Sequence, residues 1–286
     1  MTTATATWLD QERLHLHHGP IDLVLTASAD CAATARRAYH QATRRFASIL
    51  EELVAELPAL RRHHASRGPG PRGSVASRMH AAVGMYAPHV FITPMAAVAG
   101  AVADEVLAAM QSAGPLIKAY VNNGGDIAVH LGSGESFAVG VQTLANTPLG
   151  RIRISDDQGI GGLATSGQGG RSMSLGIADS VTVLAPHAAA ADAAATLIAN
   201  ATDLPGHPGI VRMPACMIDE MSDLGTRRVV VSCAPLAPPD IREALENGAR
   251  LARRFCRAGT IKAVVLCLQG TVVQVGHAAL QLDPAP

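Results

Sequence analysis

The sequence predicts a mixed α/β (α+β) fold in which mixed sheets pack against helices in a single compact unit. Short runs rich in Val, Ile and Leu, bounded by Gly, Pro and Asn, are typical of strands. They alternate with longer stretches in which apolar residues recur every three or four positions, as in amphipathic helices. The chain has 286 residues, 48% hydrophobic and only 3% aromatic, so we expect a sizeable aliphatic core.

Composition excludes several classes of protein. The formal net charge is zero, so nothing points to a nucleic-acid or membrane partner. The first ten residues lack the cationic start and apolar run of a signal peptide. The longest apolar stretch, 94–110, is interrupted by Asp104 and Glu105, which excludes a transmembrane helix. We expect one of these carboxylates to face either a site or the surface, with the surface favoured. The five scattered cysteines are typical of reduced thiols and a cytoplasmic protein.

Ten segments are predicted to be strands, because each combines apolar or β-branched residues with flanking turn residues. Segments on either side of Gly19-Pro20 and of Gln269-Gly270 are expected to form hairpins. The Pro- and Gly-rich segment 204–214 is expected to be a loop. The predicted strands lie at residues 12–18, 21–27, 116–121, 127–130, 136–141, 151–155, 180–184, 227–232, 262–268 and 271–275.

Five segments are predicted to be helices. Asp30 is a suitable N-cap for the first and Ser74 for the second. Thr93 is a suitable N-cap for the third, with Pro94 at its first position. The predicted helices lie at residues 31–57, 74–84, 94–110, 187–202 and 240–258. We expect a tail at 1–11, one domain at 12–276 and a second tail at 277–286.

The stretch 118–130 is the centre of the predicted site. A buried strand ends on the turn Asn122–Gly125, and asparagine and glycine both tolerate positive φ. Asp126 follows at once, before a second strand begins. Backbone N–H groups, two side-chain amides and a carboxylate therefore fall in one place, which suits a polar ligand or a metal–phosphate group. An ordinary hairpin with Asx turns fits the same residues equally well.

A second candidate is the segment 159–170, in which six of twelve residues are glycine. Backbone without side chains can pass close to a nucleotide or another flat ligand, and Thr165 and Ser166 add hydroxyl donors. No Lys-Ser or Lys-Thr follows, so the segment is not a Walker loop. No obvious helix follows either, as a dinucleotide fingerprint would require.

A third candidate lies on the predicted helix 187–202. Asp192 and Thr196 are four residues apart, so their oxygens lie on one face. Hard oxygen ligands of this kind suit magnesium or calcium better than zinc. An aspartate in the first turn also simply favours the helix dipole, and both interpretations stay open.

These motifs occur in an order that resembles the ApbE superfamily, and the resemblance extends over about residues 12–276. The closer resemblance is to an ApbE-like family of uncharacterised proteins, whose pattern is similar to residues 93–100, to the Asn-Asn-Gly-Gly-Asp turn and to residues 172–179. The four motifs shared with the superfamily are residues 121–127, 165–167, 180–184 and 191–196.

The resemblance implies an ApbE-like fold with a ligand cleft lined by these turns. Members of the superfamily are flavin transferases that move FMN from FAD to a Thr or Ser of a target protein with magnesium. By resemblance, Asp192 and Thr196 would hold magnesium. The residues that would bind FAD or FMN are Asn122, Asn123, Gly124, Gly125, Thr165, Ser166 and Gly167.

The chain departs from the flavin transferases at two places. Residues 172–179 stand where those enzymes have His-x-x-Asp-Pro, and Ala99-Gly100 stands in place of Lys-Gly. Two classes of function therefore stay open. One is an enzyme that acts on a flavin- or nucleotide-like small molecule with a divalent metal, with Asp126 or Asp179 as the general base. The other is a non-catalytic protein that binds a flavin- or pterin-type ligand. The Ala- and Gly-rich helices also suggest a homodimer.

Overall fold

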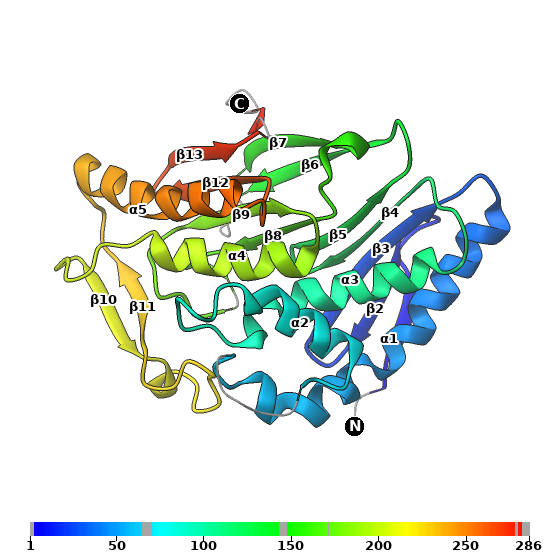
Figure 1. The fold of residues 1–286 in the computed structure, drawn as a ribbon, viewed down its shortest axis with the longest axis horizontal. Coiled ribbons are helices and arrows are strands. Elements are labelled where there is room, and N and C mark those ends of the chain that lie inside the picture. The colour runs from blue at the N-terminus through cyan, green and yellow to red at the C-terminus, as the bar shows by residue number, and fades with distance from the viewer. Residues whose placement is uncertain (1–2, 65–69, 143–147, 171, 278–279, 282–286) are drawn as a thin grey trace. The chain divides into compact units, whose positions relative to one another are not determined.

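The computed structural model describes residues 3–64, 70–142, 148–170, 172–277 and 280–281. It confirms the mixed α/β class, with helices packed beside antiparallel sheets (Figure 1). The chain divides into two compact units. Unit 1 comprises Met1–Ser136, Ser155–Ala164 and Ala185–Ala193, and unit 2 comprises Phe137–Ile154, Thr165–Leu184 and Ala194–Pro286. Each unit is assembled from three stretches, so no single linker separates them.

Unit 1 contains an antiparallel sheet in the order β1-β2-β3-β4-β5-β8. Alternate residues point into the core, and Leu16, Leu23, Leu25 and Val121 are fully buried. Strand β1 falls in the segment that we expected to be a tail, and it pairs with β2. The strands are β1 (Thr5–Trp8), β2 (Leu14–His18), β3 (Ile21–Ser28), β4 (Lys118–Asn123), β5 (Asp126–Leu131) and β8 (Gly162–Ser166).

The helices of unit 1 pack against this sheet, with α3 beside β4 and β5 and α1 beside β2 and β3. Two predicted caps are wrong. The N-cap of α1 is Cys31, without a side-chain hydrogen bond, and not Asp30. Ser74 is the first residue of α2 and not its cap, because its hydroxyl donates to Glu105. The elements are α1 (Ala32–Leu60), α2 (Ser74–Gly84), the 3₁₀ turn η1 (Pro94–Ala97) and α3 (Val98–Gln111).

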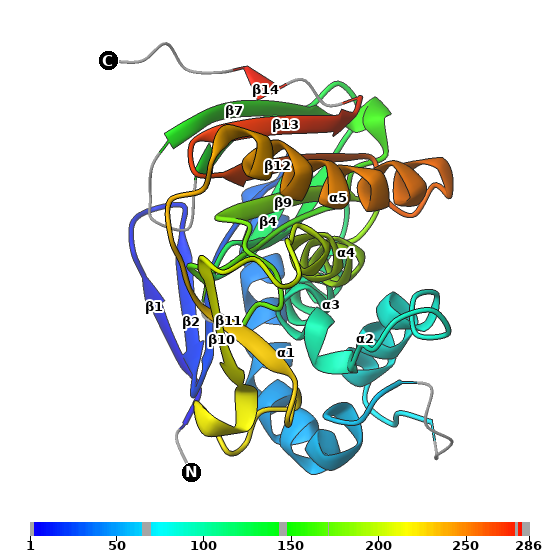
Figure 2. The same ribbon diagram turned by 90° about the vertical axis from the view of Figure 1, so that its left-hand side faces the viewer.

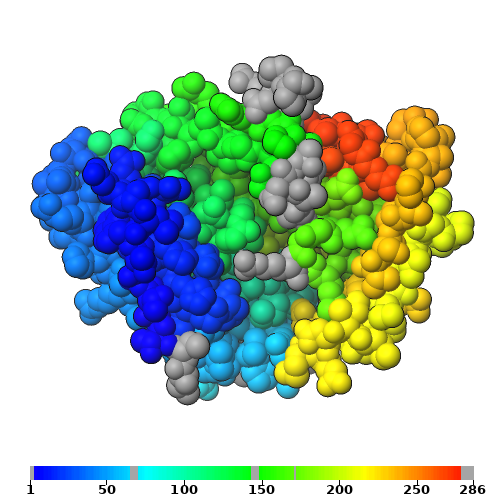
Figure 3. Space-filling model, turned by 180° about the vertical axis from the view of Figure 1, so that it is seen from behind, coloured from blue at the N-terminus to red at the C-terminus, as the bar shows by residue number. Residues whose placement is uncertain are grey.

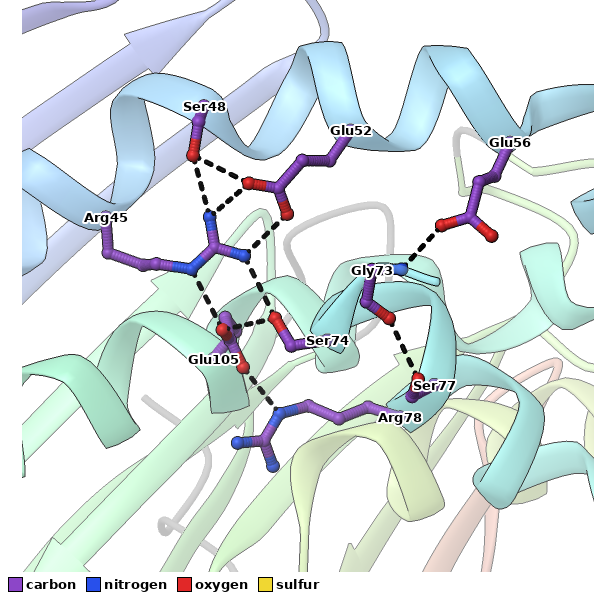
Figure 4. Close-up of polar contacts among 9 residues, drawn as sticks. All are labelled: Arg45, Ser48, Glu52, Glu56, Gly73, Ser74, Ser77, Arg78 and Glu105. Atoms are coloured by element: carbon purple, nitrogen blue, oxygen red, sulfur yellow. Dashed lines mark hydrogen bonds and ion pairs between the residues drawn. The ribbon is translucent and has the colours of Figure 1, made fainter. Parts of the chain in front are cut away.

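A network of ion pairs ties α1, α2 and α3 together (Figure 4). Glu105 on α3 accepts hydrogen bonds from Arg45 on α1 at 2.9 Å and from Arg78 and Ser74 on α2 at 2.9 and 2.5 Å. Its side chain is only 11% exposed, so the expected surface position is wrong for this residue. Burial alone would raise the pKa of Glu105, but these hydrogen bonds outweigh it and the pKa is lowered.

Glu105→Ala is expected to destabilise the protein by about 2 kcal/mol, because hydrogen bonds to a charged group are lost. Arg78 loses the carboxylate that accepts its Nε–H, and Arg45 keeps its ion pair with Glu52 on the same helix. Chemical denaturation measures the change. Glu246→Ala is the matched control, since Glu246 forms an ion pair with Arg253 in which both side chains are about half exposed. An exposed pair contributes little, so equal losses in the two variants would contradict the prediction.

Unit 2 contains the sheet β9-β12-β13, with α5 packed on β12 and β13 (Figure 2). Besides β1, three strands lie where sequence patterns predicted none: β8 in the glycine-rich segment, β10 in the expected loop at 204–214 and β14 in the expected tail 277–286. The elements are β6 (Ser136–Gln142), β7 (Pro148–Ser155), β9 (Ser180–Ala185), α4 (Ala188–Ala201), β10 (Ile210–Pro214), β11 (Arg228–Cys233), α5 (Pro238–Arg257), β12 (Ala263–Leu268), β13 (Thr271–Gly276) and β14 (Leu280–Gln281).

No helix in the described ranges is long and apolar enough to cross a membrane. All five cysteines are free thiols. Cys267 is buried as a small apolar side chain, whereas Cys31 is exposed at the start of α1.

Candidate functional site

Helix α3 and the first part of α4, both in unit 1, each provide a carboxylate that caps the first turn of the other helix. Asp104 on α3 accepts hydrogen bonds from the N–H groups of Ala188 and Ala189, at 3.0 and 2.9 Å, where α4 begins. Asp192 on α4 accepts one at 3.0 Å from the N–H of Gly100, in the first turn of α3. Each carboxylate thus satisfies backbone donors at the positive end of the other helix. The expected surface position of Asp104 is therefore wrong, because it is needed as an interhelical cap.

Glycine makes this approach of the two helices possible. A Cβ atom on Gly100 would lie 2.3 Å from the carbonyl oxygen of Ala188. A Cβ atom on Gly162, at the start of β8, would lie 2.1 Å from the amide nitrogen of Ala188. Such distances are far inside van der Waals contact. In this part of the glycine-rich segment, the space left by the missing side chain is therefore filled by the protein's own backbone.

The site carries an excess of buried negative charge. Burial, followed by repulsion from Asp126, raises the pKa of Asp192 well above its ordinary value, and the N–H groups of Gly100 and Ala99 offset this only in part. Burial also raises the pKa of Asp104, despite its two backbone hydrogen bonds. Asp192 is densely surrounded yet keeps some exposure. A carboxyl group in these surroundings is stabilised when it binds a proton or a cation, because its negative charge is then neutralised.

The β4–β5 hairpin brings the predicted turn to the same place. Gly124 and Gly125 have φ angles of 64° and 112°, so the turn requires residues that tolerate positive φ. The side chain of Asn122 closes the turn by accepting the N–H of Gly125 at 2.8 Å, which confirms the hairpin interpretation for that residue. Asn123 instead donates from Nδ2 to the carbonyl of Ala99 at 3.1 Å, and so ties the hairpin to the start of α3.

The remaining predicted residues lie in unit 2. Thr165 shares a 2.9 Å hydrogen bond with the hydroxyl of Thr182. Gly167 has a φ of 154°, and a Cβ there would lie 2.6 Å from the carbonyl oxygen of Asp179. Asp179 accepts the N–H of Gln269 at 2.5 Å, and burial raises the pKa of its carboxyl group. Ser166, half-buried, ends strand β8.

The structure therefore groups Asn123, Asp126 and Asp192 within unit 1, and Gly167 and Asp179 within unit 2. Thr196 lies on α4 one turn beyond Asp192 and is half-buried. Among the described residues, no three His, Cys, Asp or Glu side chains gather closely enough to hold a metal by themselves. Sequence analysis missed the role of Asp104, whose only local signal was that it and Glu105 are the two charged residues of a mostly apolar helix.

The fold and the site define an α/β protein in which a hairpin turn and two mutually capped helix N-termini surround buried carboxylates. A family model described as "AbpE bacteria" matches residues 6–274, and the chain belongs to that family. Its curated relatives include the UPF0280 proteins of Methanopyrus kandleri, 46% identical over 112 residues, and of Methanosphaerula palustris, 33% identical over 154 residues. These matches cover 39% and 53% of this chain, and 44% and 62% of the relatives. The chain thus spans about half the length of the curated relatives it matches.

Solved structures that align with this chain include flavin transferases of the ApbE type. The apo Pseudomonas stutzeri flavinyl transferase ApbE aligns over 96% of this chain and 95% of its own, with 13% identity and a TM-score of 0.48. The Vibrio cholerae flavin transferase ApbE aligns over 96% and 97%, with 13% identity and a TM-score of 0.40.

Proposed function

We propose that the protein binds a flavin- or nucleotide-like small molecule together with magnesium and acts on it as an enzyme. The observation that carries the proposal is the half-buried carboxylate Asp192, which repels Asp126 and faces the positive end of α3. A divalent cation beside Asp192 would neutralise this charge. Family membership and the ApbE-type structural neighbours support FAD or FMN as the class of ligand.

The donor set at Asp192 fits magnesium. This ion is usually held by one or two carboxylates and completes its shell with water and substrate phosphates, so three clustered carboxylates are not required. Asp192 accepts the N–H of Gly100 at 3.0 Å, and because each carboxylate oxygen has two lone pairs, it can still offer a hard donor to a cation. In the proposal Asp192 and the hydroxyl of Thr196 hold the ion, which would supply charge neutralisation at a phosphate group.

We further propose that the flavin-binding residues include Asn123 and the glycine turn 124–125, whose N–H groups and amide suit a diphosphate. Thr165, Ser166 and Gly167 remain proposed ligand contacts. Asp126 and Asp179 remain the candidate general bases. Burial raises the pKa of Asp179, which moves its proton affinity toward the range useful for transfer near neutral pH.

A non-catalytic flavin- or pterin-binding protein is the second candidate. The observation in its favour is that residues 172–179 and Ala99-Gly100 stand where the flavin transferases have His-x-x-Asp-Pro and Lys-Gly. Incubation with FAD and magnesium, followed by chromatography of the nucleotides, separates the two candidates. Turnover lost in Asp179→Asn with ligand binding retained supports the enzyme, whereas binding without any turnover supports the second candidate.

Thermal unfolding with FAD, FMN and ATP, each with and without magnesium, tests the binding step. A ligand at a hundredfold excess over its dissociation constant should stabilise the native protein by about 2.7 kcal/mol. The FAD shift is expected to depend on magnesium in the wild type and to lose that dependence in Asp192→Ala. Asp157→Asn, at an exposed carboxylate, is the control that should retain it. If none of these ligands shifts the wild-type transition, the flavin or nucleotide proposal fails.

A further inference from the structure

The turn between β12 and β13 places a glutamine where the backbone favours another residue. Leu268 pairs with Thr271, so Gln269 and Gly270 form a two-residue turn, and their φ angles are 44° and 78°. Gln269 is the one residue other than glycine with a positive φ in the described ranges. Hairpin turns with positive φ at both positions favour Asn, Asp or Gly at the first. A strained residue of the wrong type for its turn indicates that its side chain has another role.

Both ends of the Gln269 side-chain amide are bound to the stretch of chain that leads from β11 to α5. Oε1 accepts the N–H of Leu236 at 2.9 Å, and Nε2 donates to the carbonyl of Ala234 at 2.9 Å. This stretch lies at the surface, where the chain passes from yellow to orange in Figure 3. An asparagine would suit the turn better, but it is one methylene shorter and its amide would fall short of these groups. The length of glutamine is therefore used to hold the turn.

The backbone of Gln269 is directed at a carboxylate that the proposed function uses. Its N–H donates to Oδ2 of Asp179 at 2.5 Å. Asp179 is also held through its own backbone, because its N–H donates to the carbonyl of Cys267 at 2.9 Å. The direction of the Gln269 N–H follows from the conformation of the turn, so the side-chain amide that fixes Gln269 also fixes the Asp179 carboxylate.

The electrostatic surroundings of Asp179 make this hydrogen bond measurable. Burial raises the pKa of Asp179, and the hydrogen bond from Gln269 lowers it in part. Two thiols lie near the carboxyl group. Burial first, and then the charge of Asp179, raises the pKa of both Cys233 and Cys267, so neither thiol is ionised near neutral pH. Loosening the Gln269 hydrogen bond should therefore raise the pKa of Asp179 further.

We propose that Gln269 is a positioning residue, which holds the Asp179 carboxylate in place to accept a proton and become the neutral acid. The inference rests on the proposed function, in which Asp179 is a candidate general base. Three observations support it: the positive φ of Gln269, its doubly bound amide and its hydrogen bond to Asp179. Such a residue affects the rate without touching the ligand, because small displacements of a catalytic group cost much of the rate.

Gln269→Gly tests the positioning directly, because glycine suits the positive φ but has no amide. Carbon-13 NMR of the Asp179 carboxyl group, assigned by comparison with Asp179→Asn, should show a titration midpoint at higher pH than in the wild type. Gln269→Asn, which also suits the turn, should give the same result, and circular dichroism verifies that both variants are folded. Gln274→Ala, at an exposed glutamine of the same hairpin, is the control and should leave the midpoint unchanged. An unchanged midpoint in a folded Gln269→Gly or Gln269→Asn protein overturns the inference.

Turnover of FAD with magnesium provides the second readout. Gln269→Gly is expected to lower kcat about tenfold and to leave KM nearly unchanged, because Gln269 acts through Asp179 and not on the ligand. The acidic limb of the pH profile of kcat should move to higher pH, since a base with a raised pKa loses its proton only at higher pH. Equal turnover in the variant and the wild type would overturn the inference and leave the proposed function standing. A wild type without turnover would overturn the proposed enzyme, and the role of Asp179 with it.

Discussion

In the absence of magnesium, Asp192→Asn is expected to be more stable than the wild type at pH 8. The variant keeps an oxygen that can accept the N–H of Gly100 but no longer carries a charge near Asp126. In the wild type, ionising a carboxyl group whose pKa is raised costs about 1.4 kcal/mol for each pH unit between the ordinary and the raised pKa. With the proposed magnesium site, adding the ion should reverse the order, because only the wild type would retain the carboxylate that is proposed to hold it.

The sign of the pH dependence follows from the raised pKa. Folded Asp192 holds its proton more tightly than the unfolded chain does, for which the ordinary value is 3.8. This contribution to stability is fully present below that value and is lost as the pH rises through the raised pKa. The stability advantage of Asp192→Asn over the wild type should therefore grow as the pH rises above 3.8, until it passes the raised pKa.

Urea denaturation in the presence of a chelator, at several pH values in this range, measures the difference. Comparing the two proteins cancels other titrations, including that of His80, whose pKa is lowered chiefly by burial. Asp157→Asn, at an exposed carboxylate, is the control and should differ from the wild type by the same amount at every pH. A pH-independent difference for Asp192→Asn would show that Asp192 does not have a raised pKa.

Gly100→Ala is expected to be among the most destabilising single changes in the protein. Two effects oppose each other. Alanine is intrinsically better in a helix by about 1 kcal/mol. The new Cβ, however, would lie 2.3 Å from the carbonyl oxygen of Ala188 and 2.5 Å from its carbonyl carbon. Forcing a group into packed backbone commonly costs about 1–3 kcal/mol, and sometimes more. The strain should win, because α3 and α4 are joined there by the Asp104 and Asp192 caps.

Differential scanning calorimetry should show a Tm lowered by about 2–4 °C for each kcal/mol lost. The magnesium response should weaken as well, since separating the helices moves Asp192 from the N–H of Gly100. Gly140→Ala is the matched control, because a Cβ on Gly140 would meet nothing within 4 Å. A Gly100→Ala protein as stable as this control would contradict the close approach of the two helix starts.

Local chemistry predicted much of this protein. The Asn-Asn-Gly-Gly turn requires positive φ at its two glycines, and neighbouring residues suffice to define it as a hairpin. Helices α3, α4 and α5 lie at or close to the predicted ranges, although Pro94, expected at the first position of the third helix, begins the 3₁₀ turn η1 that precedes α3. The family resemblance also came from motif order along the chain, and the family match over residues 6–274 confirms it.

Only the tertiary structure decided what the carboxylates and the glycines of the candidate site contact. Asp104 caps a helix that begins 84 residues later, and Asp192 caps one that begins far upstream. Gly162 belongs to strand β8, and its missing side chain leaves space for the first residue of α4. From the sequence alone, the glycine-rich segment suggested space for a ligand instead. Periodicity and turn chemistry act over a few residues, and a residue's partners across the fold depend on how helices and strands pack. Sequence therefore defined the elements and the family, whereas packing decided how the carboxylates and glycines are used.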